Sequence, residues 1–456
     1  MASESLADAI ARAGSPVEVL RNQSWPAFTF PVAPEFTNWR DEQRAWSAAV
    51  AVLDLSHHMT QLFLHGADLI AMLESISPNT FENFRPGIGK QLIAVNQDGY
   101  LIGDGILFYN WEGPEGLVLV GHHMLIDWVR FNVEKSAAAG KDVHARLEAN
   151  SNMREAPPTF YRYQLQGPHA NAVMEKIFGG PAPDVKFFHI GEVTIAGKAV
   201  RALRHGMAGQ PGFEFYGPWA DHEAVRTALL EAGEEFGIRR VGSKAYSATP
   251  LESGWVPTPF AAIFDEDLAE YREWLPAARA GSIGGSLYSQ DIHDYYMTPY
   301  DIGLERSVRF DHDFHGRGAL ERIAAAPPRR KVTLLWNAGD VADVVRSQLE
   351  PGVPGKFLEF PKARYGLFQM DEVRLNGARV GISTDAGYIS YDQIYMSLAT
   401  LDVEIADGTE VEVVWGEDPI SAKPQVDAVH RQMIIRATVA PAPYHEYART
   451  VYRADS

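Results

Sequence analysis

The segment Gly206-Met-Ala-Gly209-Gln-Pro-Gly212-Phe213-Glu214-Phe215 is the most specific motif of the sequence. Three glycines at a spacing of three residues let the backbone bend tightly and approach a flat ligand. The strand that follows points Glu214 to one face and both phenylalanines to the other. A carboxylate in that position can accept two hydrogen bonds from an amino-pyrimidinone edge. A dinucleotide site is excluded because a helix should follow its glycines; a plain hairpin turn is the alternative.

Two upstream segments also combine glycines with polar side chains that could contact a ligand. Tyr163-Gln164-Leu165-Gln166-Gly167-Pro168 ends a strand and opens a helix, since proline suits a first helical turn. Gln164 and Gln166 share one face, and they either bind a ligand or satisfy backbone groups. Asn96-Gln-Asp-Gly99-Tyr-Leu-Ile-Gly103-Asp104-Gly105 predicts a turn and then a strand that holds Asp104 between glycines. Bare backbone there suits close ligand contact, and a bulge with an exposed acid is the alternative.

These motifs lie in two stretches that share one order of elements, β-α-β-β-(β)-α. The apolar period switches between 2 and 3.6 in both, which is typical of α+β units of the split-βαβ type. The first stretch has strands at 61–64, 91–95, 101–109 and 117–120 and helices at 67–76 and 123–138; the second has strands at 161–166, 192–195, 199–203 and 212–216 and helices at 169–178 and 222–236.

The C-terminal part has a different pattern. The Ala-Pro-rich segment 324–328 predicts a boundary, and the basic cluster Arg329-Arg330-Lys331 after it reads as a solvated linker. Beyond it, helical patterns nearly vanish. Many short strands with glycine turns predict a small β-barrel or sandwich, so we expect an α+β protein with two lobes and an all-β cap. The strands expected there are at 331–336, 373–375, 396–399, 410–414 and 433–439.

Composition excludes several classes of function. The 456 residues contain no cysteine, which excludes disulfides, thiolate metal sites and cysteine nucleophiles. A formal net charge of −18 repels phosphate backbones, so we expect no nucleic-acid partner. Neither a membrane span nor the apolar core of a secretion signal is apparent, so we expect a cytoplasmic protein. The run Asp311-His312-Asp313 with His315 invites a metal site, but adjacent residues rarely converge on one ion, and we predict no metal.

In this order, the three motifs resemble the aminomethyltransferase family, the folate-binding T-protein of glycine cleavage and its relatives. The resemblance runs from about residue 35 through nearly the whole chain. It implies a three-lobed ring around tetrahydrofolate, with two interleaved α+β lobes in residues 1–325 and a small β-barrel in residues 326–456. The further segments that carry it are Leu251-Glu252-Ser253-Gly254, Pro299-Tyr300-Asp301-Ile302-Gly303, Phe314-His315-Gly316-Arg317-Gly318-Ala319-Leu320, Gly381-Ile382-Ser383-Thr384 and Met396-Ser397-Leu398-Ala399.

The resemblance also implies residue roles. Glu214 would hold the pterin edge, Gln164 would lie beside the folate, and Trp255 would pack on the pterin or the substrate ring. Asp104 is the survivor of a pair of acids, because Gly103 replaces the first one. Two family arginines are also missing from Ala245-Tyr246-Ser247-Ala248-Thr249-Pro250, so glycine cleavage itself is not expected.

A closer resemblance is to the bacterial tetrahydrofolate-dependent aryl O-demethylases, which act on syringate and vanillate. It implies transfer of a methyl group from a methoxybenzoate to give 5-methyl-tetrahydrofolate. Phe30 and His122 stand where vanillate-type enzymes would lead us to expect Tyr and Arg, which favours syringate as substrate and 3-O-methylgallate as product. Vanillate, 3-O-methylgallate, a sulfonium or methylamine donor, and a non-catalytic folate scaffold stay open. The segments that carry it are Ala33-Pro34-Glu35-Phe36, Asn38-Trp39-Arg40, His57-His58-Met59, Arg204-His205-Gly206-Met207-Ala208-Gly209 and Leu251-Glu252-Ser253-Gly254-Trp255.

Aryl methyl transfer needs aligned reactants and a donor aimed at the leaving oxygen. Tyr246 and His58 are candidates for that donor, and Asp104 is a third candidate catalytic residue. The alternatives are an ordinary packed tyrosine, a satisfied strand end at the two adjacent histidines, and a helix start at His122. The oligomeric state is not predicted. The expected substrate-binding residues are Phe30, His57, His58, His122 and Tyr246.

Overall fold

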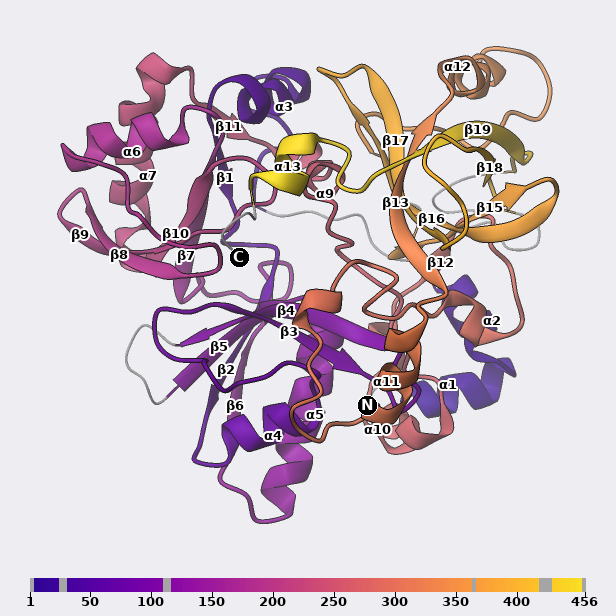
Figure 1. Cartoon of the computed structure of the whole chain (residues 1–456), viewed down its shortest axis with the longest axis horizontal. Helices are drawn as coiled ribbons and strands as arrows, with labels where there is room; N and C mark the ends of the chain where they lie inside the picture. Colours follow the sequence, from indigo (N-terminus) through magenta and orange to yellow (C-terminus); the bar gives the residue numbers. More distant parts are fainter. Residues whose placement is uncertain (1–3, 24–30, 110–115, 363–365, 418–428, 453–456) are drawn as a thin grey trace.

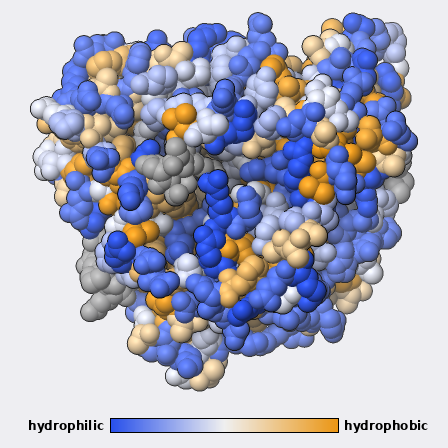
Figure 2. All heavy atoms as spheres, in the orientation of Figure 1, coloured by the Kyte–Doolittle hydropathy of each residue, from blue (hydrophilic) through white to orange (hydrophobic). Residues whose placement is uncertain are grey.

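The computed structural model describes residues 4–23, 31–109, 116–362, 366–417 and 429–452. They form three lobes around a common centre, in the order that the colours of Figure 1 follow along the chain. The face seen in Figure 2 is largely hydrophilic, with apolar side chains in scattered patches. Among the described residues, no helix combines the length and apolar character that crossing a bilayer requires.

The first lobe is a five-stranded sheet in the order β3-β4-β5-β2-β6, whose neighbouring strands are antiparallel. Helix α5 packs on its central strands and buries apolar side chains from Met124 to Val133. The first sequence stretch therefore forms one lobe, as predicted, and only β6 was missed. The elements are β2 (Thr60–His65), α4 (Leu69–Ser75), β3 (Lys90–Val95), β4 (Leu101–Tyr109), β5 (Gly116–Gly121), α5 (His123–Ala138) and β6 (His144–Glu148).

The second lobe is a six-stranded sheet in the order β11-β1-β7-β10-β9-β8. Its strand β1 precedes the whole first lobe in sequence, so the two lobes are interleaved. Short strands β1 and β11 were not predicted, since three or four residues carry too little periodicity. The elements are α3 (Trp39–Ala48), β1 (Ala51–Asp54), β7 (Phe160–Gln166), α6 (Ala170–Phe178), β8 (Ile190–Ile195), β9 (Lys198–Leu203), β10 (Gly212–Pro218), α7 (His222–Gly233) and β11 (Arg239–Val241).

Alternation along β7 and β10 divides this sheet into an apolar and a polar face. Tyr163, Leu165 and Phe213 join the core under α6 and α7. The residues between them turn to the opposite face, where the paired Gln164 and Glu214 are almost fully buried. The predicted orientation of both motifs is therefore confirmed.

The third lobe is a closed barrel in the order β13-β17-β16-β15-β18-β19. The predicted barrel is confirmed, but two details were wrong. Arg329, Arg330 and Lys331 belong to β13 and contact Asp301, Asp407 and the Gly254 carbonyl, so they form no linker. Helix α12 was missed. The elements are β13 (Arg329–Trp336), α12 (Ala338–Ser347), β15 (Asp371–Leu375), β16 (Ala378–Ile389), β17 (Ile394–Asp402), β18 (Glu410–Trp415) and β19 (Met433–Ala440).

Short elements connect the lobes. Helices α9 and α13 lie between the second lobe and the barrel in Figure 1. These connecting elements are α1 (Leu6–Ala13), α2 (Pro16–Asn22), α8 (Ser243–Tyr246), α9 (Thr249–Ser253), α10 (Ala269–Trp274), β12 (Ile283–Gly284), α11 (Arg317–Ala325), β14 (Phe368–Gln369), α13 (Glu446–Thr450) and 3-10 turns at Trp219–Asp221, Glu234–Phe236, Glu266–Leu268, Ala277–Arg279, Ile292–Tyr295 and Glu305–Ser307.

A polar network around the buried Glu252 holds the C-terminal segment between the second lobe and the barrel. The His445 ring lies 2.9 Å from a Glu252 oxygen at Nδ1 and 2.7 Å from Asp392 at Nε2. The other Glu252 oxygen accepts hydrogen bonds from the Trp46 indole (3.2 Å) and from the Tyr391 hydroxyl. These hydrogen bonds to two carboxylates raise the pKa of His445 to about 10 against the cost of burial. His445 thus links α9 to the barrel, and Glu252 extends this network to Trp46 on α3.

We expect His445→Gln to lower the free energy of unfolding by about 2–3 kcal/mol at pH 6, because two carboxylates lose their cation. A base whose folded pKa is raised stabilises fully below its unfolded pKa of about 6.5 and loses this effect as pH rises toward about 10. The difference between wild type and variant should therefore shrink from pH 6 to pH 9 in urea titrations. His144→Gln, at an exposed histidine, is the control; an equal difference at both pH values would contradict the expectation.

Candidate active site

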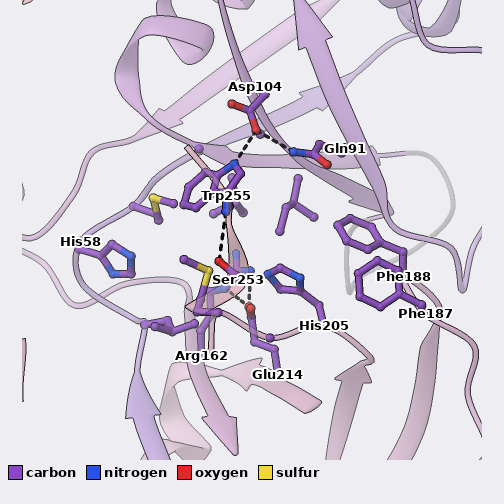
Figure 3. Close-up of a pocket in the computed structure, with 18 of the residues that line it drawn as sticks. His58, Gln91, Asp104, Arg162, Phe187, Phe188, His205, Glu214, Ser253 and Trp255 are labelled. Atoms are coloured by element: carbon purple, nitrogen blue, oxygen red, sulfur yellow. Dashed lines mark hydrogen bonds and ion pairs between the residues drawn. The ribbon is translucent and has the colours of Figure 1, made fainter. Parts of the chain in front are cut away.

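A cavity opens between the first and second lobes, and most of the predicted site residues line it. In Figure 3, Asp104 with Gln91 and Trp255 faces Glu214 with Arg162 across this cavity. His58 lies at one end, and Phe187 and Phe188 lie at the other. We call it the active-site cavity; further residues that line it are Leu55, Met59, His205, Met207, Tyr246 and Tyr452.

Glu214 is held by an arginine that was not predicted. Arg162 lies two residues before Gln164 on β7, and its Nε donates to Glu214 Oε1 over 2.6 Å. Its Nη2 forms an ion pair with the same oxygen. Both side chains are at most 6% exposed. Arg162 Nη1 is buried without a hydrogen-bond partner among the described residues, so this pair offers a donor to a ligand.

On the facing wall of the cavity, Asp104 offers a hydrogen-bond acceptor in place of a donor. Its Oδ2 accepts from Gln91 Nε2 (2.8 Å) and from the Trp255 indole (3.1 Å). Its Oδ1 is buried and accepts no hydrogen bond from the described residues. Burial raises the pKa of Asp104, although both donors oppose that shift. Trp255 therefore orients a carboxyl group as well as lining the cavity.

The hydrogen-bond donor and acceptor in this cavity that lack partners among the described residues fit tetrahydrofolate. An amino-pyrimidinone edge carries both donors and acceptors, and Arg162 Nη1 and Asp104 Oδ1 are buried groups of each kind. Buried polar groups without partners are costly, so ligand binding gains from satisfying them. Aromatic side chains of Trp255 and Phe188 supply faces on which a heterocycle can stack.

We expect Asp104→Asn to change the pH dependence of stability. Because the folded pKa is raised, the folded protein keeps a proton that the unfolded chain releases above about pH 3.9, and stability falls as pH rises through that window. The variant lacks this loss, so its stability relative to wild type should improve from pH 4 upward, by at most about 1.4 kcal/mol per pH unit. Urea titrations at several pH values measure this, with Asp184→Asn at an exposed acid as control. A difference independent of pH would contradict a raised pKa.

Tyr246 and His58 are brought together although 188 residues separate them. The Tyr246 hydroxyl lies 2.8 Å from His58 Nε2, and the two rings meet edge to face with centroids 5.0 Å apart. Tyr246 ends α8, and His58 follows the end of β1. Both line the active-site cavity, so they form a hydrogen-bonded donor pair there.

Gln164 has a different position from the expected one beside a ligand. Its Oε1 accepts from the Met207 backbone N–H (2.9 Å), and its Nε2 donates to the His205 carbonyl (3.3 Å). It holds the glycine loop and does not line the cavity. Only glycine fits at position 206 beside this loop contact, because a Cβ there would lie 1.5 Å from the Gln166 side-chain amide. The loop then places Met207 and His205 in the cavity wall.

Two of the expected substrate residues, His57 and His122, do not line this cavity. The His57 ring bonds to Ser151 (2.9 Å) and lines another cavity; burial lowers its pKa. The His122 ring packs against His123 at the start of α5, 4.2 Å between centroids. Phe30 lies outside the described residues.

The acidic and histidine-rich run near residue 312 does not converge. His312 contacts Asp311 and the Ser77 carbonyl, whereas His315 contacts Asp267 and Asp313 is fully exposed. In the part of the chain that the structure describes, no three His or acidic side chains are grouped for a metal ion.

Sequence reasoning missed several residues of the wall. Arg162 shares its strand face with Gln164, so alternation along β7 was a usable signal. Gln91 had a weaker signal, since it pairs with Ile106 and not with Asp104. Tyr452 had none, because it reaches the cavity from the C-terminal segment and bonds to the Gly206 carbonyl (3.2 Å).

Comparison with known proteins gives one consistent result. Residues 8–258 match the family model described as the GCVT N-terminal domain. A syringate O-demethylase of Sphingobium sp. is 44% identical over 100% of this chain and 98% of the relative. A sesamin methylene transferase of Sinomonas sp. is 29% identical over 84% and 82%, and an aminomethyltransferase of Pseudothermotoga lettingae is 23% identical over 83% and 86%.

A solved structure shows the same fold. The glycine cleavage system aminomethyltransferase T from Bartonella henselae matches with a TM-score of 0.60 over 96% of both chains, at 18% identity. The predicted α+β architecture with a C-terminal barrel is therefore confirmed. Together with the matched family model and the full-length relative, this shows that the chain belongs to the aminomethyltransferase (GCVT) family.

Proposed function

We propose that the protein is a tetrahydrofolate-dependent aryl O-demethylase that converts syringate to 3-O-methylgallate. The observation that carries the proposal is the Tyr246–His58 hydrogen bond of 2.8 Å, in the same cavity as the buried Arg162–Glu214 pair. The first can assist a leaving oxygen, and the second can hold a heterocycle. The 44% identity to a syringate O-demethylase supports this substrate over other methoxybenzoates.

Residues of the chain would divide the work between two ligands. Glu214, Arg162 and Asp104 would hold tetrahydrofolate by its polar edge. When bound, tetrahydrofolate supplies the amine nitrogen that accepts the methyl group. Orientation by these buried side chains can recover up to roughly 7–11 kcal/mol of the barrier, provided that the reacting atoms are aligned.

The Tyr246–His58 pair would act on the leaving oxygen of the substrate. Negative charge develops there as the carbon–oxygen bond breaks, and a donor fixed in place stabilises it without reorganisation. The Tyr246 O–H can donate to that oxygen while its own oxygen accepts from His58 Nε2. In this arrangement the Tyr246 proton would move to the leaving oxygen, a protonated His58 would return a proton to Tyr246, and the proton that the amine loses on methylation would balance the proton taken up by the product.

We also infer that the protein acts in the cytoplasm on small molecules alone. The net charge of −18 disfavours nucleic acid as a partner. Methyl transfer to an amine needs no Lewis acid, so no metal is required by this mechanism.

The test is incubation of purified protein with syringate, with and without tetrahydrofolate, and chromatography of both products. We expect equimolar 3-O-methylgallate and 5-methyl-tetrahydrofolate, formed only when folate is present. No turnover of syringate, vanillate or 3-O-methylgallate by protein that binds folate would overturn the aryl-ether assignment.

A further inference from the structure

A second cavity, of about 260 Å³, lies next to the active-site cavity. We call it the outer chamber. The end of β1 divides its residues between the two: Leu55 and His58 line the active-site cavity, whereas Asp54 and His57 line the outer chamber. The adjacent histidines therefore serve different spaces, and no role assigned above uses the outer chamber.

Strand register explains which side chains gather in the outer chamber. Asp54 on β1 pairs with Tyr163 on β7, and Val52 pairs with Arg240 on β11. Residues two apart on a strand share a face. These side chains therefore rise from the face of the sheet that α7 covers, and α7 contributes Arg226 to the same cavity.

Two arginines and one carboxylate, Arg226, Arg240 and Asp54, line the outer chamber. Arg226 forms an ion pair with Glu223. Arg240 makes no ion pair with the described residues, and its guanidinium lies 3.8 Å from the centroid of the Phe36 ring. Burial and the nearby Arg226 lower the pKa of Arg240, as expected for two cations in one cavity. Asp54 lines the same cavity but is not within ion-pair distance of Arg240, so the Arg240 guanidinium keeps donors that can bind an anion.

The Tyr163 hydroxyl provides an unused donor at the same place. The side chain is 1% exposed, and its hydroxyl has no hydrogen-bond partner among the described residues. The charged side chains that act on this hydroxyl are Asp54, Arg226, Glu223 and Arg240, so the hydroxyl lies among them. A ligand oxygen would satisfy a buried donor that otherwise carries a desolvation cost.

The walls of the outer chamber suit an aromatic ring better than an inorganic anion. Phe36, Tyr163 and Trp219 line it, and Trp219 stacks on His222 with centroids 4.1 Å apart and planes 7° apart. Guanidinium groups beside aromatic faces are typical of sites for planar carboxylates.

A third, small cavity lies between the outer chamber and the Tyr246–His58 pair. It has a volume of about 10 Å³ and shares Asp54 and His57 with the outer chamber and His58 and Tyr246 with the active-site cavity. Such a volume holds about one water molecule, so passage of a ring requires the flanking side chains to shift.

We propose that the outer chamber binds an aromatic carboxylate of the benzoate class and loads it toward the Tyr246–His58 pair. The carboxylate pairs with Arg240 and Arg226 and accepts from the Tyr163 hydroxyl. The identity of this ligand as the methyl donor rests on the proposed function, whereas binding of a benzoate does not.

The first test compares Arg240→Gln with Arg239→Gln. Arg239 is the matched control, since it neighbours Arg240 on β11 but is exposed and lies on the opposite face. At saturating tetrahydrofolate, Arg240→Gln should lower kcat/KM for syringate about tenfold with kcat unchanged. The methyl ester of syringate lacks the carboxylate, so its kcat/KM should not change. Equal values for both variants, or an equal loss with the ester, would overturn the loading role.

The second test measures binding without turnover by calorimetric titration of the full chain with 4-hydroxybenzoate, which has no methyl group to transfer. We expect Arg240→Gln to weaken one class of binding at least tenfold and Tyr163→Phe, which keeps the packed ring, to weaken it several-fold. Arg239→Gln should bind as wild type, and neutral 4-hydroxybenzamide should not occupy this class. Unchanged binding in Arg240→Gln overturns the site even if syringate is demethylated. The expected loss supports the site even if no methoxybenzoate is demethylated, which would refute only the proposed function.

Discussion

Tyr246→Phe is expected to lower kcat for methyl transfer by about 10²–10³-fold while the KM for tetrahydrofolate stays near its wild-type value. The substitution removes one hydroxyl and keeps the ring that packs edge to face on His58. The substitution removes only the proposed donor for the leaving oxygen and leaves the cavity wall with Glu214 and Asp104, the proposed folate site, unchanged. Steady-state kinetics with varied folate, and single-turnover rates at saturating folate, measure the two quantities separately.

Two further variants test whether the hydrogen bond acts as a unit. His58→Gln should also lower kcat, and the double variant should be little worse than the more damaged single variant, since groups that act together are not additive. Tyr109→Phe is the control, because Tyr109 packs on Phe84 with centroids 5.0 Å apart and does not line the active-site cavity. Independent losses that multiply would show that the two side chains do not act as a pair.

Much of the fold was predictable from local pattern. Strands β4, β7 and β10 lie beside glycine turns, so their positions were predicted, and alternation along β7 and β10 also gave their faces. Strands β1 and β11 were missed because their signal is three or four residues long. Their existence depends on pairing with β7 and with each other, which is a tertiary effect.

Residues of the cavity could be predicted where a family segment carries them, as for His58, Tyr246 and Trp255, or where a side chain follows from a strand face. Glu214 and Asp104 were found in this way. His57 and His58 were not told apart, because the chain leaves the strand at Asp54 and each histidine then turns to a different cavity. Gln164 was assigned to a ligand because sequence cannot show that the Met207 N–H already occupies its oxygen. The positions of these side chains depend on contacts with residues distant in sequence, which local propensity does not predict.

Glu214→Gln is expected to lower the free energy of unfolding by about 3–5 kcal/mol and to weaken tetrahydrofolate binding at least tenfold. The stability loss arises because Arg162 stays buried without its counter-ion, and removing one partner of a buried pair is more costly than the pair is stabilising. The binding loss arises because a neutral amide neither orients Arg162 nor offers a charged acceptor to the pterin edge. Urea titration measures the first, and calorimetry with tetrahydrofolate measures the second.

The double variant Glu214→Leu with Arg162→Met separates these two effects. Apolar replacement of both partners removes the uncompensated charge, so most of the lost stability should return, as is common for buried ion pairs. Tetrahydrofolate binding should not return, because the same replacement removes the carboxylate and the unpaired Nη1 donor from the cavity wall. If binding recovered together with stability, the pair would be a structural feature of β7 and β10, and the pterin edge would be held by the Asp104 wall alone. If stability recovered and binding did not, the Arg162–Glu214 pair would instead be present for ligand binding and not for the stability of the fold.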